Sequence, residues 1–186
     1  MRGADIAHLQ RSSLGNMPRR FLKPSSLIRR QLKDGDLVVE MSGGSPTQST
    51  GRAAIITDDL LKRLEVPLSS SNFCKIVRPL NRENAFFLYG QLRSSWNKGE
   101  FFPYENGSTG IKNLAFADYC SAKVISLPPP VELKRFNTLA SNHFEGMQSL
   151  GVESSLLAET RDALLPQLMS GKLRVKDAEA IVESVV

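Results

Sequence analysis

The chain has 186 residues, of which 41% are hydrophobic and 23% charged, and its net charge is +5. This composition excludes extensive disorder and predicts a buried core, and the length suits one domain with or without an appendage. No apolar stretch approaches the roughly 18 residues that a membrane-spanning helix needs, and no signal-peptide pattern follows the basic N-terminus. We therefore expect a cytoplasmic protein that does not associate with membranes.

The positive charge is concentrated at the start of the chain. Residues 1–33 contain eight Lys or Arg and one acid, which gives +7, so the remainder carries −2. A surface of this kind suits a polyanion, because each Lys or Arg near a phosphate releases condensed counterions. The alternative is a solvated basic surface without a partner.

Prolines at positions 18 and 24 predict loops and short elements throughout residues 1–33. The Asp34-Gly35 turn precedes a predicted strand at 36–41, which is followed by a polar Gly/Ser/Thr loop at 42–52. A second strand is predicted at 53–57. Thr57 and Asp58 can then cap a short helix that ends at residue 62 or 64.

The middle of the chain continues this mixed pattern. A third strand is predicted at 73–79, followed by a helix at 82–96 and a second polar loop at 97–110. Four side chains of this helix are expected in the core: Phe86, Phe87, Tyr89 and Leu92. A fourth strand is predicted at 122–128. It leads into three prolines at 128–130, where we place a domain boundary.

The last predicted element is a helix from 131 to 165, about 50 Å long at 1.5 Å per residue. Its apolar stripe follows a seven-residue repeat, which is typical of a coiled coil and requires a partner helix from another region or another chain. The repeat consists of Leu133, Phe136, Ala140, His143, Met147, Leu150, Leu157 and Leu164. Pro166 is predicted to end the helix, and a Ser170-Gly171 turn and a short strand at 173–175 follow.

No residue pattern indicates catalysis or a metal site. Cys74 and Cys120 lie 46 residues apart without a Cys-x-x-Cys motif, and we expect two buried, reduced thiols. The glycine-rich loop at 42–52 lacks the Gly-Lys-Ser/Thr ending of a phosphate-binding P-loop. No nucleophile is paired with a base at a known spacing. The chain is therefore predicted to be non-enzymatic and to carry no metal or cofactor.

Four segments of the chain follow one another in the order GDLVVEMSGGSPTQSTGRAAII, ENGSTGIKNL, KVISLPPPVELKRFNTLA and RDALLPQLMSGKLRV. Together they resemble one half of the specificity subunit of type I restriction-modification systems. The opening RGADI also resembles the start of that family's recognition domain, so the resemblance covers roughly residues 2 to 175. The chain departs from the family in lacking much of the lead-in expected before RGADI, and in a coiled-coil stripe that is more polar than ideal.

The resemblance implies an α+β fold in which a mixed-strand target recognition domain, with polar DNA-reading loops, precedes one long helix. The helix would form an antiparallel coiled coil with a partner. The implied domains are recognition at 1–129, the helix and terminal strand at 130–175, and a tail at 176–186. A complete specificity subunit has two such units, so this chain would be a fragment, an isolated C-terminal half or a natural half-subunit that forms a homodimer.

The implied partners are double-stranded DNA, a modification subunit and, through it, a restriction subunit. S-adenosylmethionine would be bound by the modification subunit and not by this chain. The helix would hold two recognition domains at a fixed distance on a two-part DNA site. At 3.4 Å per base pair, an arm of about 50 Å limits the gap between half-sites to about 15 base pairs.

With DNA as the expected ligand, the hydrogen-bonding groups of the side chains indicate which residues contact it. Gln48 and Arg52 are the leading base readers, because glutamine pairs with adenine and arginine with guanine through two hydrogen bonds each. The cluster of Arg19, Arg20 and Lys23 is expected to bind phosphates. The remaining candidates for DNA contact are Thr47, Ser49, Asn97, Lys98, Ser108, Thr109 and Lys112. The coiled-coil contacts are expected from Phe136, Ala140, His143, Met147, Leu150, Leu157 and Leu164.

Other readings of the same sequence remain open. The loops at 42–52 and 106–112 can be plain surface loops, and Trp96 can belong either to the core or to a DNA contact. The whole chain can be an adaptor whose coiled coil binds proteins, or an inactive specificity-subunit fragment without a DNA target.

Overall fold

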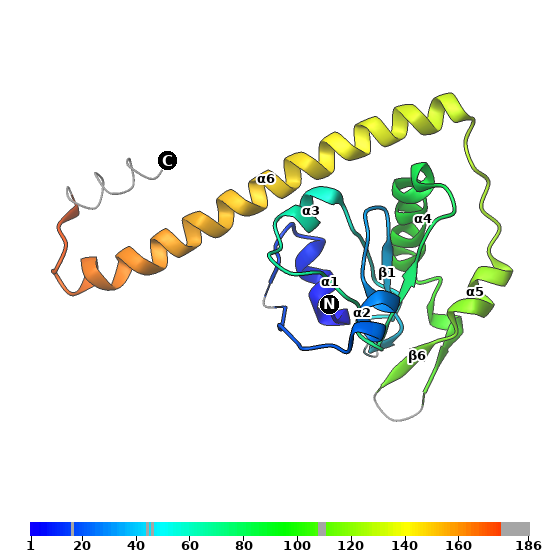
Figure 1. Ribbon diagram of the computed structural model, residues 1–186, viewed down its shortest axis with the longest axis horizontal. Helices are drawn as coiled ribbons and strands as arrows, with labels where there is room; N and C mark the ends of the chain where they lie inside the picture. Colours follow the sequence, from blue (N-terminus) through cyan, green and yellow to red (C-terminus); the bar gives the residue numbers. More distant parts are fainter. Residues whose placement is uncertain (16, 44, 46, 108–110, 176–186) are drawn as a thin grey trace.

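The computed structural model describes residues 1–15, 17–43, 45, 47–107 and 111–175. It has an α+β architecture in which residues 1–129, called the head, precede a long helix, called the arm (Figure 1). The helices of the head are α1 (Gly3–Leu9), α2 (Pro24–Arg30), α3 (Asp58–Lys62), α4 (Ala85–Asn97) and α5 (Phe116–Ala122), and the arm is α6 (Pro130–Met169). The strands are β1 (Leu37–Glu40), β2 (Ser42–Gly43), β3 (Ala53–Ile55), β4 (Cys74–Val77), β5 (Glu105–Asn106) and β6 (Lys112–Leu114).

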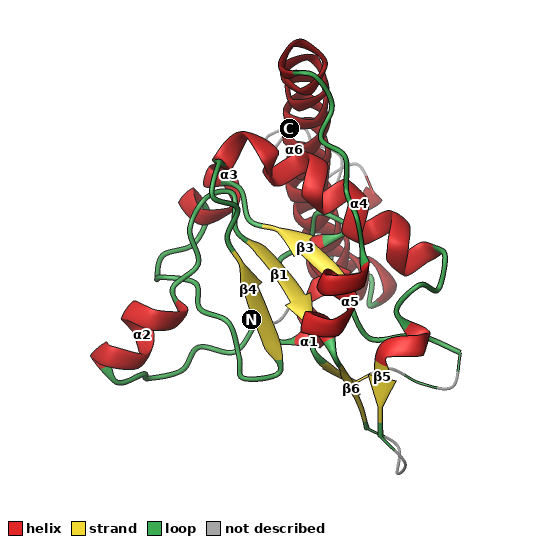
Figure 2. Cartoon of the chain, turned by 90° about the vertical axis from the view of Figure 1, so that its right-hand side faces the viewer, coloured by secondary structure: helices red, strands yellow, loops and turns green. Residues whose placement is uncertain are grey.

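The main sheet of the head is antiparallel, with the strand order β3-β1-β4, and it is covered on both faces (Figure 2). Alternate residues of a strand point to opposite faces. Leu37 and Val39 accordingly join one apolar cluster with α4 and α5, while Val38 joins a second cluster with Ile6 of α1. All four residues of β1 are buried, which explains why its sequence is continuously apolar before Glu40.

A second, smaller sheet has the order β2-β6-β5 and extends from the end of the first sheet (Figure 2). The link between the sheets is Met41, whose N–H donates to the Phe73 carbonyl and whose carbonyl accepts from the Leu114 N–H. The chain therefore passes from the buried main sheet into a sheet that carries the polar loops.

Most of the elements predicted for the head are confirmed. The strands expected at 36–41, 53–57 and 73–79 are β1, β3 and β4. Thr57 caps α3 as expected, because its Oγ1 accepts from the Leu60 N–H at 3.3 Å. The helix expected at 82–96 is a 3₁₀ turn (Arg82–Asn84) followed by α4; Phe86, Tyr89 and Leu92 are buried, and Phe87 is half-buried.

Two predictions for the segment before the arm are wrong. Residues 123–129 form no strand but an extended connector, because no neighbouring strand pairs with them; Val124 is 88% and Leu127 53% exposed. Residues 116–122 form helix α5. Cys74 is buried as expected, but Cys120 is exposed because it lies on the outer side of α5.

The arm is longer than predicted, since Pro166 lies inside the helix, which ends at Met169. A proline this near the end removes one late hydrogen bond without ending the helix. Gly171, at φ 70°, ends it instead: its N–H donates to Leu168, and the Lys172 N–H donates to Gln167. These two bonds satisfy otherwise free carbonyls of the last turn. Residues 173–175 do not form the predicted strand, since Val175 is already helical.

The first half of the arm lies on the head, and the second half projects beyond it (Figure 1). Leu133 is buried, and Ala140 and Phe144 pack against the cluster that contains α4. Large apolar side chains are mostly exposed further along: Leu150, Val152, Leu156, Leu157, Leu165 and Met169 are 45–80% exposed. The head thus covers the start of the apolar stripe, whereas the stripe from Leu150 onward is mostly exposed.

Candidate nucleic-acid interface

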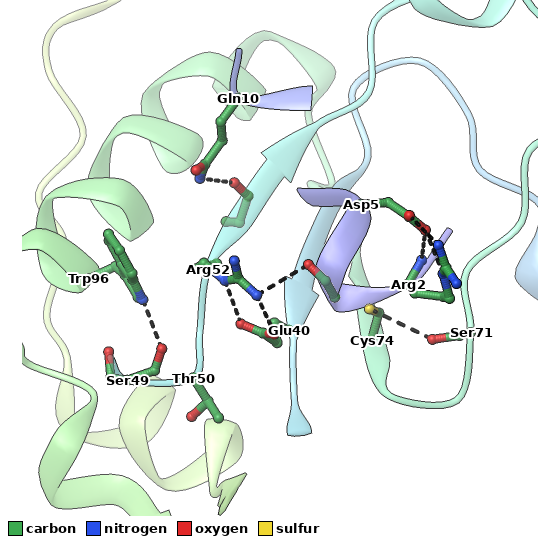
Figure 3. A network of polar contacts seen from close by, with 12 residues as sticks. Arg2, Asp5, Gln10, Glu40, Ser49, Thr50, Arg52, Ser71, Cys74 and Trp96 are labelled. Carbon is green, nitrogen blue, oxygen red and sulfur yellow. Dashed lines mark hydrogen bonds and ion pairs between the residues drawn. The ribbon is translucent and has the colours of Figure 1, made fainter. Parts of the chain in front are cut away.

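The base of the polar loop 42–52 is closed by a buried ion pair (Figure 3). Arg52 donates to Glu40 twice, from Nε at 2.8 Å and from Nη2 at 2.7 Å, and the two side chains are only 15% and 4% exposed. The hydrogen bond to Glu40 raises the pKa of Arg52. Breaking this pair would leave a buried carboxylate without a partner, which is strongly unfavourable. In this geometry Arg52 holds the loop, and its guanidinium is not available to read guanine.

Two further contacts hold the loop along its sides. The indole N–H of Trp96, on α4, donates to the Ser49 carbonyl at 3.1 Å (Figure 3). Thr50 donates to Glu105 of β5 from its N–H at 2.6 Å and from its hydroxyl at 2.8 Å. Ser49 and Thr50 are buried. The Ser49 side chain, a predicted DNA contact, therefore lies inside the loop rather than on its surface, and Trp96 acts as a structural anchor.

Glu105 joins this loop to the β5–β6 hairpin. Its second carboxylate oxygen binds Lys112 Nζ at 2.8 Å, and the Glu105 side chain is 5% exposed. Burial by itself raises the pKa of Glu105, but the hydrogen bonds from Lys112 and Thr50 outweigh it and hold the pKa below its usual value. Lys112 is thus engaged inside the protein and does not present a free ammonium group to a phosphate.

The tip of the loop is the part that remains exposed to a ligand. Ser45 and Gln48 exchange backbone hydrogen bonds, and Ser45 Oγ accepts from the Gln48 N–H at 3.0 Å. Thr47 is exposed between them, and Gln48 is half-buried. Thr47 and Gln48 therefore carry a hydroxyl and an amide directly before Ser49 and Thr50, which are held in place.

The two polar loops predicted from separate parts of the sequence are brought together. Strand β2 pairs with β6, with Ser42 opposite Asn113, and Ser42 Oγ donates to Asn113 Oδ1 at 2.5 Å. Asn97 and Lys98 are exposed at the end of α4, directly after the Trp96 anchor. We call the loop 42–52, the hairpin residues 105–106 and 112–114, and residues 97–98 the loop cluster. Ser108 and Thr109, also predicted contacts, lie outside the described residues.

The basic N-terminal cluster lies apart from the loop cluster, beside α2 and on the opposite side of the head in Figure 2. Arg20 and Lys23 are exposed, and Lys23 directly precedes α2. Arg19 binds Glu65 at 2.6 Å, with both side chains more than 70% exposed. Such exposed pairs exchange partners readily because water screens them.

The predicted coiled-coil residues fall into two groups. Phe136 and Ala140 contact the head: the Phe136 ring meets Phe87 edge-on at 6.2 Å, and Ala140 packs on the α4 cluster. For these two, the chain's own head supplies the partner surface. The others are exposed (His143, Leu150, Leu157) or half-buried (Met147, Leu164). A shallow groove on the arm is lined by Leu150, Glu153, Ser154, Leu157, Ala158 and Arg161.

The residues that organise the loop cluster were not identified from the sequence. Glu40, Glu105 and Trp96 make the contacts that fix the loop, and of these only Trp96 is among the residues singled out in the sequence. A signal for one of them was present, since a glutamate and an arginine flank the loop at positions 40 and 52. Opposite charges at the two ends of a loop are positioned to close it. No comparable signal links Thr50 to Glu105, 55 residues away.

Within the described part of the chain, no group of three or more His, Cys, Asp or Glu side chains is arranged to hold a metal ion. Among the same residues, no helix has the length and apolar character required to cross a membrane. Neither the protein-family models nor the curated proteins with which the chain was compared match it.

Proposed function

We propose that this chain is a sequence-specific DNA-binding half-unit of the type I specificity-subunit kind, which acts on a two-part DNA site as a homodimer. The observation that carries the proposal is the loop cluster, in which two polar loops are joined by β2–β6 pairing and held by Glu40, Glu105 and Trp96. A rigid support for exposed polar side chains is what base-edge reading requires.

Within this proposal, Thr47, Gln48, Asn97 and Lys98 face the DNA, and Gln48 is the principal base reader. Arg52, Ser49 and Lys112 support the loops from inside. The basic cluster of Arg20 and Lys23, with Arg19 after release from Glu65, attracts DNA phosphates from a separate surface of the head, apart from the loop cluster. The chain has no catalytic role and binds no cofactor itself.

The proposed partners follow from the same assignment. The exposed row of leucines on the projecting half of the arm pairs antiparallel with the arm of a second copy. A modification subunit, which carries S-adenosylmethionine, docks on the paired arms and recruits a restriction subunit. The complex would act on DNA in the cytoplasm.

The test is selection of bound sequences from a pool of randomised DNA duplexes, with and without a modification subunit. The proposal expects one enriched two-part sequence and a steep loss of affinity between about 50 and 200 mM salt, because phosphate contacts release counterions. Recovery of no preferred sequence under either condition contradicts it.

The exposed leucines of the arm also favour a second function, that of a protein-interaction adaptor. Dimer formation does not distinguish the DNA-binding half-unit from the adaptor, because both functions predict a dimer. Measuring DNA affinity at increasing salt does distinguish them, because the adaptor does not bind DNA at any salt concentration. A chain that dimerises and binds a modification subunit but not DNA would be an inactive specificity fragment.

A further inference from the structure

The arm is fixed to the head by a second contact beyond its apolar one, and this contact lies where the arm leaves the head. The apolar contact comes first along the arm: Phe144 meets Phe86 at 5.3 Å and Tyr89 at 5.5 Å between ring centroids, and Asn137 Nδ2 donates to the Glu83 carbonyl at 2.6 Å. A helix held only at this patch could still pivot about it.

Three polar groups prevent such pivoting one turn further along. Gln148 Nε2 donates to Thr57 Oγ1 at 2.7 Å, and Arg63 Nη1 donates to the Gln148 carbonyl at 2.9 Å. Thr57 is the residue that caps α3, and Arg63 follows the last residue of α3. Both ends of this short helix therefore bind the same residue of the arm.

Gly151 completes the contact, because the loop after α1 approaches the arm too closely for any side chain. A Cβ atom at Gly151 would lie 2.8 Å from Ser12 Cβ and 2.9 Å from the Ser12 carbonyl carbon, and nearer still to the carbonyl oxygen. Ser12 itself has φ 59°, a backbone conformation that non-glycine residues adopt only where their surroundings enforce it. Gly146, the other glycine in the arm, has open space around its Cβ position.

The position of this contact gives it leverage over the rest of the arm. Residues 152–169 extend about 27 Å beyond Gly151 at 1.5 Å per residue. A rotation of about 10° at the contact moves the end of the arm by about 5 Å, which exceeds the 3.4 Å rise of one base pair. The length of the arm alone therefore does not determine where a second head would lie.

We infer that this contact, formed by Ser12, Thr57, Arg63, Gln148 and Gly151 and called the shoulder, sets the direction of the arm and thereby the gap between half-sites that the dimer accepts. The shoulder residues are positioning residues and do not touch DNA. The inference that the shoulder selects the gap rests on the proposed function; the inference that it orients the arm does not.

The experiment compares Gly151→Ala with the matched variant Gly146→Ala. Both introduce one methyl group into the same helix, but only the first meets the backbone of Ser12. Exposed Cys120 on the head and a Met169→Cys substitution at the end of the arm provide two sites for spin labels, while Cys74 is buried. When the labelled protein is diluted with unlabelled protein, only distances between two labels on the same copy are measured.

For Gly151→Ala we expect a shift of several ångström, or a broadening, of the distance distribution between the two labels, whereas Gly146→Ala reproduces the parent distribution. Gln148→Ala, which removes the bond to Thr57 without a steric clash, should broaden the distribution in the same way if Gly151→Ala does not fold. Unchanged distributions for both shoulder variants overturn the inference that the shoulder orients the arm.

The second readout uses duplexes with the selected half-sites at gaps of different length. The parent and Gly146→Ala should prefer one gap, and the shoulder variants should bind several gaps within about threefold of one another with unchanged half-site sequences. A shoulder variant that keeps the single preferred gap overturns the role in spacing. If the parent protein binds no DNA, the proposed function fails, and the label distances still decide whether the shoulder orients the arm.

Discussion

Gln48 and Arg52 lie four residues apart in one polar loop and have opposite roles in the structure. Arg52 is buried with Glu40, whereas Gln48 is half-buried and its backbone N–H donates to Ser45 Oγ. The same division applies to the hairpin, where Lys112 is paired with buried Glu105. A polar residue in a loop is therefore available to a ligand only where the acids of the protein have not already bound it.

At the residue scale, Gln48→Ala tests the reading role. If Gln48 pairs with one base, its loss should reduce discrimination at that position by about 1–3 kcal/mol, or roughly 5- to 160-fold, and leave the other positions unchanged. Base preferences from randomised-duplex selection give the measurement. Gln167→Ala, an exposed glutamine on the arm, is the control. A uniform loss of affinity at all positions would mean that Gln48 contacts the DNA backbone instead.

Glu105→Gln tests whether the buried carboxylate holds the loops together. The pKa of Glu105 is lower in the folded protein than its usual value of 4.5. The ionised Glu105 therefore stabilises the fold fully above pH 4.5, and this stabilisation is lost as the pH falls through the pKa of the folded state. The variant should lose about 1–2 kcal/mol of unfolding free energy at pH 7, and less below pH 4. Denaturant unfolding between pH 7 and 3 measures this.

Glu132→Gln is the control for that measurement, because Glu132 is an exposed glutamate on the arm and its replacement removes an equal charge. A Glu105→Gln protein whose deficit in stability is the same at pH 7 and pH 3 would show that packing, and not the ionised pair, supports the loops.

At the scale of elements, the arm shows how one helix serves two surfaces. An α-helix has 3.6 residues per turn, so a stripe that repeats every seven residues drifts about 20° per repeat around a straight helix. The stripe therefore begins against the head at Leu133 and Ala140 and emerges on an exposed face by Leu150 and Leu157. The residues that meet the head instead follow the helical period: Leu133, Asn137, Ala140, Phe144, Gln148 and Gly151.

Leu150→Asp tests whether the exposed part of the stripe binds a second arm. A charge desolvated in such a contact costs several kcal/mol, so the dimer should weaken at least 100-fold while the head stays folded. Molar mass by light scattering and helix content by circular dichroism measure the two effects. Val152→Asp is the control, since Val152 is also exposed but lies about 200° around the helix. A dimer mass that survives Leu150→Asp would contradict pairing through this face.

At the scale of the whole molecule, the shape separates a compact head from an arm that projects past it (Figure 1). The arm has 40 residues and is about 60 Å long; one side of its first half is covered by the head, whereas the part from Leu150 onward projects beyond the head. Two copies joined through these projecting halves form a symmetric pair, and symmetry of that kind places the two heads in opposite orientations.

The site selected by the parent protein should therefore be an inverted repeat with a gap of fixed length. Only the projecting parts of the two arms, each about 27 Å long, overlap, because the first half of each arm lies on its own head. The gap should therefore stay below about 15 base pairs. Binding to duplexes in which the gap is changed by one or two base pairs measures this, with half-sites held constant. Equal affinity for direct repeats would argue against a symmetric dimer.

The features that could be predicted from the sequence are local ones. The strands at β1, β3 and β4, the Thr57 cap and the helix α4 follow from alternation, capping and helical period, which act over a few residues. The same reasoning placed a strand at 122–128, because an apolar run resembles a strand whether or not a neighbour exists to pair with it. It also ended the arm at Pro166, where local chemistry permits the helix to continue.

Which polar side chains are exposed to a ligand, and where the arm points, depend on contacts between distant parts of the folded chain. The partners of Arg52, Lys112 and Thr50 come from other elements, and the contact at Gly151 depends on a loop near position 12. Contacts between residues far apart in the chain leave no periodic pattern in either segment. The composition of the loops could therefore be predicted from the sequence, but not their availability, which depends on ion pairs formed when the chain folds.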